Sequence, residues 1–154
     1  MRTFRFSLEK VLQFKTQQEN ELSSQLAQLQ RELLNQRRRL SQIMEEQQNT
    51  LTQWEHAQQD TLSLKVVSLY QGHLEYLRRR CHFQREHIAV LDRELEEHRR
   101  LLIRMSKERR ILERLKERQL AEYRSELMSK EQGFLDEVGN NLYLRNRSKE
   151  SLSI

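Results

Sequence analysis

The stretch "HAQQDTLSLKVV", residues 56–67, decides whether this chain forms one long helix or two. Regularly spaced leucines lie on both sides of it, and the two spacings, extended into the stretch, disagree by one position. Three of its residues belong to the types that cap helix N-termini, namely Asp60, Thr61 and Ser63. We therefore predict a tight reversal over residues 58–65. The alternative is one continuous helix with a slip of frame, and the pattern alone leaves it open.

On either side of this stretch, apolar residues recur at alternating steps of four and three, which is the spacing of a coiled-coil seam. The first ladder is Leu8, Leu12, Lys15, Glu19, Leu22, Leu26, Leu29, Leu33, Gln36, Leu40, Ile43, Gln47, Thr50, Trp54. The second is Val67, Tyr70, Leu74, Leu77, Cys81, Gln84, Ile88, Leu91, Leu95, His98, Leu102, Met105. A reversal between them brings apolar positions opposite each other, pairing Leu22 with Leu102, Leu29 with Leu95, Ile43 with Cys81 and Trp54 with Tyr70.

These ladders predict an all-α fold, a long antiparallel two-helix coiled-coil hairpin. The first coiled-coil helix is expected over residues 1–57 and the turn over 58–65. The second coiled-coil helix is expected over 66–138. Gly139 is followed by two asparagines, which is a helix stop signal, so residues 139–154 are predicted to form a flexible C-terminal tail.

Composition supports long solvated helices rather than a thick core. The chain of 154 residues contains no proline, three glycines and 33% charged residues. Its net charge of +5 arises from residues 78–150, where 19 Lys and Arg stand against 14 Asp and Glu. Acidic residues are interleaved there, as in "DRELEEHRR", which is typical of a salt-bridged helix face. A nucleic-acid reader would show a concentrated basic stripe, so we expect no nucleic-acid partner.

Nothing in the sequence indicates export or membrane insertion. Cys81 is the only cysteine, which excludes an intrachain disulfide and fits a reducing compartment. The first residues lack a continuous apolar segment, because Arg5, Ser7 and Glu9 interrupt it. No stretch approaches the roughly 20 apolar residues that cross a bilayer. We expect a cytoplasmic protein that reaches a membrane only through a partner.

No motif for catalysis, metal binding or cofactor binding is present. The chain has no glycine-rich phosphate loop, no paired-cysteine spacing and no HExxH, and Cys81 and His98 fall on the predicted seam. A two-helix hairpin also has no enclosed pocket to exclude water from a reaction. We therefore predict a non-enzymatic protein without a metal or cofactor. Tyr76 and Phe83 lie off the ladder and are candidate contact residues for a partner.

The N-terminal stretch "FRFSLEKVLQFK", residues 4–15, is more apolar than a two-stranded coil requires, which indicates a docking end. It resembles the N-terminal signature of the FliJ family of the bacterial flagellar type III export apparatus. The matching positions are Phe4, Phe6, Leu8, Val11, Leu12 and Lys15. The layout is similar over about residues 2–145, including "SLYQGHLEYL" after the turn, a basic second arm and a polar tail.

The resemblance implies a coiled coil like the central stalk of a rotary ATPase, acting without enzymatic activity. It implies that the end bearing both termini docks in the hexameric ring of the flagellar export ATPase and promotes its assembly and activity. The docking residues carried over are Phe4, Phe6, Leu8, Val11, Leu12, Leu120, Tyr123 and Leu127. Contact with the membrane-embedded export gate is implied for Trp54, Tyr70, His73 and Leu77.

The resemblance also implies an escort role toward export chaperones and a location in the cytoplasm, peripherally associated with the inner membrane at the flagellar base. A hairpin of this kind is expected to be a monomer. The alternative from the residues themselves is a homodimeric structural coiled-coil scaffold, which requires residues 58–65 to stay helical. A basic nucleic-acid binder is the least supported reading, because of the interleaved acids.

Overall fold

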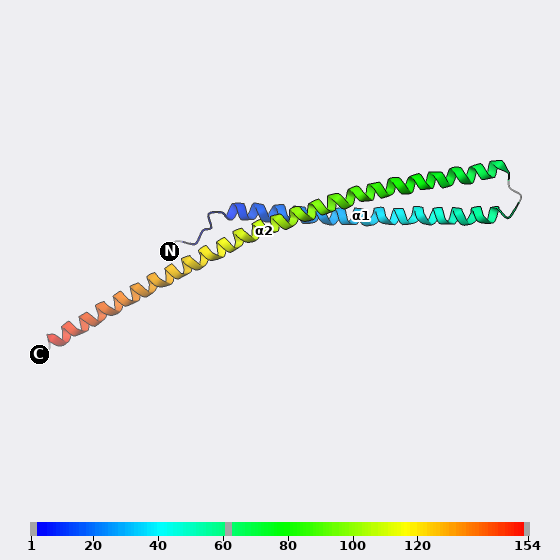
Figure 1. The fold of residues 1–154 in the computed structure, drawn as a ribbon. Coiled ribbons are helices and arrows are strands. Elements are labelled where there is room, and N and C mark those ends of the chain that lie inside the picture. Colours follow the sequence, from blue (N-terminus) through cyan, green and yellow to red (C-terminus); the bar gives the residue numbers. More distant parts are fainter. Residues whose placement is uncertain (1–2, 61–62, 153–154) are drawn as a thin grey trace. The chain divides into compact units, whose positions relative to one another are not determined.

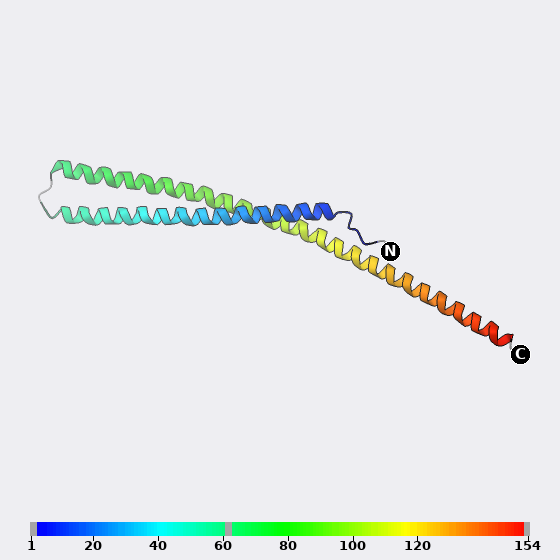
Figure 2. The ribbon, with the colours of Figure 1, turned by 180° about the vertical axis from the view of Figure 1, so that it is seen from behind.

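The structure, a computed structural model, describes residues 3–60 and 63–152. Helix α1 runs over Glu9–Ala57 and helix α2 over Leu64–Ser151, and the two pack against each other as an antiparallel pair (Figures 1 and 2). Helix accounts for 93% of the described residues, and none of them forms a strand. The predicted all-α helical hairpin is confirmed.

Packing divides the chain into two units, which are described separately. The hairpin unit is Gln17–Ser106, and the terminal unit comprises Met1–Thr16 and Lys107–Ile154. Each unit contains parts of both helices. The turn and most of the apolar seam therefore belong to the hairpin unit, whereas the N-terminal segment belongs to the terminal unit together with the C-terminal part of α2.

Two apolar clusters form the core of the hairpin unit. One consists of Ile43, Leu77 and Cys81 with Leu40 packed against them. The other consists of Leu33, Leu91 and Leu95, packed by Leu26, Leu29 and Ile88. Every member occupies a predicted ladder position, and the pairings of Ile43 with Cys81 and of Leu29 with Leu95 lie within these clusters. Leu22 and Leu102 are half-buried, and their pairing stays a prediction.

A polar layer separates the two clusters in the seam. The side-chain amide of Gln84 donates to the side-chain oxygen of Gln36 at 2.6 Å and to its backbone carbonyl at 3.0 Å. Gln36 is buried and donates in turn to the carboxylate of Glu32. Buried amides cost free energy unless they are paired, so this layer favours the register in which the two glutamines meet.

The reversal lies where the two ladders change frame. Helix α1 ends at Ala57, and α2 begins at Leu64, two residues before the predicted start. Ser63 caps α2, since its hydroxyl accepts a hydrogen bond from the backbone N–H of Val66 at 3.3 Å. Residues 61–62 of the predicted turn, including the candidate cap Thr61, lie outside the described residues. The expected packing of Trp54 on Tyr70 is confirmed, with ring centroids 5.4 Å apart.

Both chain ends depart from the sequence-based expectation. Residues 3–8 were expected to be helical, but α1 begins only at Glu9. Aromatic and β-branched residues are weak helix formers, and here Phe4 packs on Tyr123 of α2 and Phe6 is buried, instead of propagating a helix.

The helix stop at Gly139 is wrong, because α2 continues through it to Ser151. Gly139 does not adopt positive φ. A glycine inside a helix costs only about 1 kcal/mol relative to alanine, and the following segment contains no proline that would end the helix. Lys149 in the last turn adds a favourable interaction with the helix dipole.

Candidate docking surfaces

The N-terminal segment packs on α2 through Phe4, and its second aromatic residue, Phe6, is buried. The ring of Phe4 lies against Tyr123, with centroids 5.7 Å apart at a tilt of 46°. Phe6 retains only 7% of its exposure, and Leu12, one turn into α1, is also buried. Leu120 and Leu127 are half-buried. Six of the eight predicted docking residues are thus buried or half-buried before any partner arrives, namely Phe4, Phe6, Leu12, Leu120, Tyr123 and Leu127.

Two ion pairs join α1 and α2 in the terminal unit. The Lys15 ammonium lies 2.6 Å from the Glu108 carboxylate, and the Lys116 ammonium lies 2.7 Å from that of Glu9. All four side chains are partly exposed, so each pair contributes little and is screened by salt. The predicted polar seam position Lys15 is therefore an ionic rung.

Apolar surface remains exposed beside this packing. Leu8 and Val11 are exposed, and so is Phe14, which the sequence-based set of docking residues omitted. Substitution of Leu8 or Val11 would therefore alter surface with little disturbance of packing. Substitution of Phe6 or Leu12 would disturb the unit itself.

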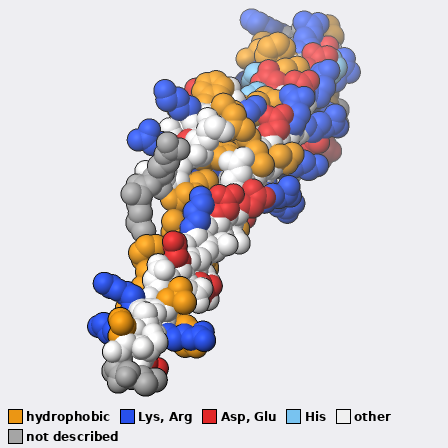
Figure 3. All heavy atoms as spheres, turned by 90° about the vertical axis from the view of Figure 1, so that its left-hand side faces the viewer, with side chains coloured by type: hydrophobic (Ala, Val, Ile, Leu, Met, Phe, Trp, Pro, Cys, Tyr) orange, Lys and Arg blue, Asp and Glu red, His pale blue; other side chains and the backbone are white. Residues whose placement is uncertain are grey.

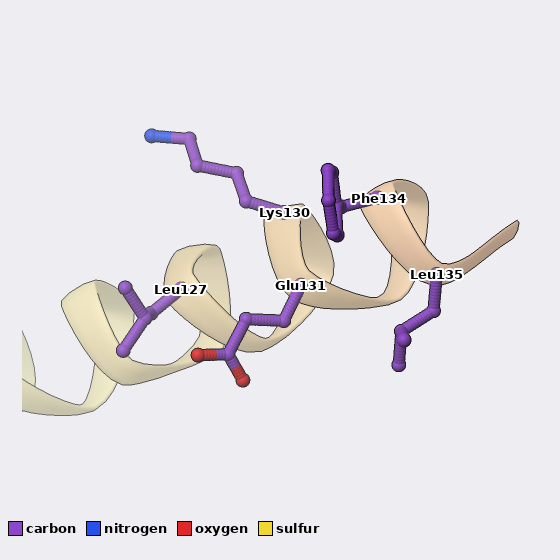
Figure 4. A pocket seen from close by; sticks show the side chains of 5 residues that line it. All are labelled: Leu127, Lys130, Glu131, Phe134 and Leu135. Carbon is purple, nitrogen blue, oxygen red and sulfur yellow. The ribbon is translucent and has the colours of Figure 1, made fainter. Parts of the chain in front are cut away.

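The C-terminal part of α2 carries a second stretch of uncovered apolar side chains. A shallow hollow is lined by Leu127, Lys130, Glu131, Phe134 and Leu135, all from one helix (Figure 4). Phe134 is 66% exposed. Viewed toward the C-terminal end of α2, hydrophobic side chains lie at the surface among basic and polar ones (Figure 3). This stretch continues the face on which Tyr123 and Leu127 lie, since those residues and Phe134 follow helical spacing.

The predicted gate-contact residues belong to the hairpin unit and differ in exposure. Trp54 and Tyr70 are half-buried, and His73 is exposed with its Nε2 atom 3.7 Å from the Glu46 carboxylate. Leu77 is fully buried in the seam, so it presents no surface to a partner. Tyr70 and His73 line a shallow groove together with Thr50, Gln53, Val66 and Leu69, and Trp54 packs on Tyr70.

Among residues 3–60 and 63–152, no three His, Cys, Asp or Glu side chains gather to hold a metal ion. Neither helix has, in its described part, an apolar stretch long enough to cross a membrane. The candidate functional surfaces described above consist of exposed apolar side chains on the two paired helices.

The family model of the flagellar FliJ protein matches residues 4–148, nearly the whole chain. The chain belongs to the FliJ family. Comparison with curated proteins and with solved structures gives no significant match. As a FliJ protein, the chain is a structural component of the flagellar protein export apparatus and interacts with that machinery. The resemblance stated from the N-terminal motif and the layout is confirmed.

Proposed function

We propose that this FliJ protein is a central-stalk-like coiled coil that docks its terminal unit in the ring of the flagellar export ATPase. The observation that supports docking most directly is the exposed apolar surface of Leu8 and Val11, beside a segment held by Phe4 and Phe6. Apolar side chains left uncovered on thin paired helices mark an interaction site. Docking promotes assembly of the ATPase hexamer and its turnover.

Each predicted docking residue has one of two tasks in this proposal. Leu8 and Val11 contact the ring, and Leu127 extends the contact along α2. The other five are buried or half-buried and support the contact surface from inside the terminal unit, namely Phe4, Phe6, Leu12, Leu120 and Tyr123. The groove beside Trp54, Tyr70 and His73 contacts the membrane-embedded export gate, whereas Leu77 supports that surface from the core.

Family membership supports the remaining roles in this proposal. The protein escorts export chaperones, and it acts in the cytoplasm, peripherally associated with the inner membrane at the flagellar base. It works as a monomeric hairpin. The alternative, a homodimeric scaffold, required helix through residues 58–65, but α1 ends at Ala57 and α2 restarts at Leu64.

The test is hydrolysis by the purified flagellar export ATPase with and without this chain, together with ring formation measured by sedimentation. Leu8→Ser with Val11→Ser should weaken stimulation by about tenfold, because the substitutions remove the apolar area that the ring would cover and a few central contacts carry most of the binding energy. The matched control is Leu34→Ser with Met44→Ser, which removes equally exposed side chains from the hairpin unit. Unchanged stimulation by the Leu8 and Val11 variant would exclude the docking assignment.

A further inference from the structure

A row of exposed apolar residues runs along α2 on a side that α1 does not cover. Leu69, Tyr76, Phe83 and Val90 follow one another at intervals of seven residues. All four are exposed, from 45% at Val90 to 72% at Phe83. They are separate from the seam, whose residues in this stretch include Leu77, Cys81 and Leu91. Helix α2 therefore carries two rows with heptad spacing: the seam, which α1 covers, and this second row, which is exposed.

A period of seven is informative about what can cover the row. When two helices pack along each other, residues seven apart stay in the shared interface over several turns. A globular partner would need no such period, and a bilayer surface is better matched by a broad apolar face. Here the row is one residue wide, with polar residues on both borders. The occupant that fits is an α-helix carrying its own apolar residue in each heptad.

Arginines border the row at its centre. Arg79 and Arg80 lie one helical turn from both Tyr76 and Phe83, because residues three and four apart are neighbours on a helix. The guanidinium of Arg80 lies over the Tyr76 ring, 5.7 Å from its centroid, and makes no ion pair with the described residues. His73 stacks on the same ring, with centroids 6.3 Å apart. Tyr76 is thus held in place before a partner arrives.

The charges around the row indicate which net charge a partner should carry. Five arginines and three acidic residues lie between residues 69 and 93. Arg78 and Arg79 share the single carboxylate of Glu75, at 2.8 and 3.4 Å, so one positive charge is left unbalanced there. The acids near the row are Glu75, Glu86 and, across from His73, Glu46. Glu94 lies beside Val90 at the far end of the row, and Asp92 pairs with Arg37 of α1. The net field beside Tyr76 and Phe83 is positive and favours an acidic partner.

We propose that the row Leu69, Tyr76, Phe83 and Val90 binds an acidic amphipathic α-helix of a partner protein as a third helix on the hairpin unit. The row meets the groove assigned to the export gate at Leu69, which lines that groove, and at His73, which stacks on Tyr76. The groove itself is left to the gate. The row is independent of the docking residues in the terminal unit.

The test uses two synthetic helical peptides of about four heptads with leucine at every seventh position. One carries glutamate beside the leucines and the other lysine, and binding to the full chain is followed by fluorescence anisotropy. The acidic peptide should bind at least about tenfold more tightly than the basic one. Tyr76→Ser with Phe83→Ser should weaken that binding by about tenfold or more. Arg79→Glu with Arg80→Glu should abolish the preference for the acidic peptide.

The matched control is Phe134→Ser with Leu135→Ser, which removes comparable exposed surface from the terminal unit and should leave peptide binding unchanged. Circular dichroism checks that all variants remain helical. Equal binding of both peptides, or no effect of the Tyr76 and Phe83 variant, would overturn the proposal. So would binding to phosphatidylglycerol vesicles or single-stranded DNA in place of the acidic peptide. ATPase stimulation by the Tyr76 and Phe83 variant, measured in parallel, separates this proposal from ring docking.

Discussion

The hairpin unit and the terminal unit use the same helices but are held together differently. In the hairpin unit, six apolar side chains are buried in two clusters and a glutamine pair lies between them. In the terminal unit, Phe6 and Leu12 are the buried apolar residues among those described, and two exposed ion pairs join the helices. Burial of apolar area contributes far more than exposed ion pairs. The hairpin unit therefore contributes most of the free energy of unfolding. The terminal unit is the part that can open and rearrange.

This difference fits the proposed division of tasks. A stalk needs a stiff pair of helices, which a continuous apolar seam provides. A docking end needs exposed apolar side chains and weak internal pairing, so that a partner can compete for the same surface. Local opening with small free-energy cost is common at surfaces that bind. The contrast is measurable, because the two units should respond very differently to single substitutions.

The largest effect is expected for Leu77→Ala. Leu77 is the largest fully buried side chain among the described residues, and its truncation leaves a cavity between α1 and α2. The free energy of unfolding should fall by about 2–5 kcal/mol, as measured by urea denaturation followed by circular dichroism. The control Leu69→Ala, on the exposed row, should stay within about 0.5 kcal/mol of the wild type. Equal losses in the two variants would refute the assignment of the core.

A smaller effect is expected from the glutamine layer. Gln84→Leu leaves the buried Gln36 amide without its partner on α2, which should cost about 1–3 kcal/mol. The double variant Gln36→Leu with Gln84→Leu should recover most of that loss, because no polar group is then stranded. Sedimentation should reveal association of the double variant, since the restriction on partner number is gone. A double variant as unstable as the single one would mean that the pair acts through packing alone.

The seam was predictable from the sequence, whereas the ends were not. A period of seven over twelve or more positions repeats the same physical constraint many times, so Ile43, Leu77 and Leu95 could be placed without a structure. The ends depend on single residues. Gly139 signals a stop only weakly. The N-terminal segment stays outside the helix while Phe4 packs on Tyr123 of α2, a contact that local propensity does not encode.

For the candidate contact residues, too, the sequence predicted some features and not others. Tyr76 and Phe83 were expected to be exposed because they lie off the ladder, and they are. Their membership in a row with Leu69 and Val90 was visible in the spacing but became meaningful only with the exposures known. Leu77 was assigned to a contact surface by analogy, yet its ladder position already indicated burial. Phe14 was passed over, although its place off the ladder indicated exposure.

Phe6→Ala tests whether the terminal unit opens by itself. Loss of the buried ring should raise hydrogen exchange of the backbone amides of residues 9–16 by about tenfold, which corresponds to about 1.4 kcal/mol of local opening. The urea midpoint of the whole chain should hardly move, because the hairpin unit does not depend on this ring. A fall of the midpoint comparable to that of Leu77→Ala would show that the two units unfold as one.

The smallest effect is expected from the ionic rung of the terminal unit. Lys15→Ala removes the pair with Glu108, whose side chains are 27% and 40% exposed, and should raise exchange of residues 9–16 by an amount equivalent to about 0.2–1 kcal/mol. Because exposed pairs are screened, the difference from the wild type should vanish near about 1 M salt. Arg100→Ala serves as the control, since Arg100 pairs with Glu96 on the same helix and joins nothing across the seam. If the effect of Lys15→Ala persists at high salt, the lysine stem is packing on α2 through its methylene groups, and the terminal unit is held by apolar contact after all.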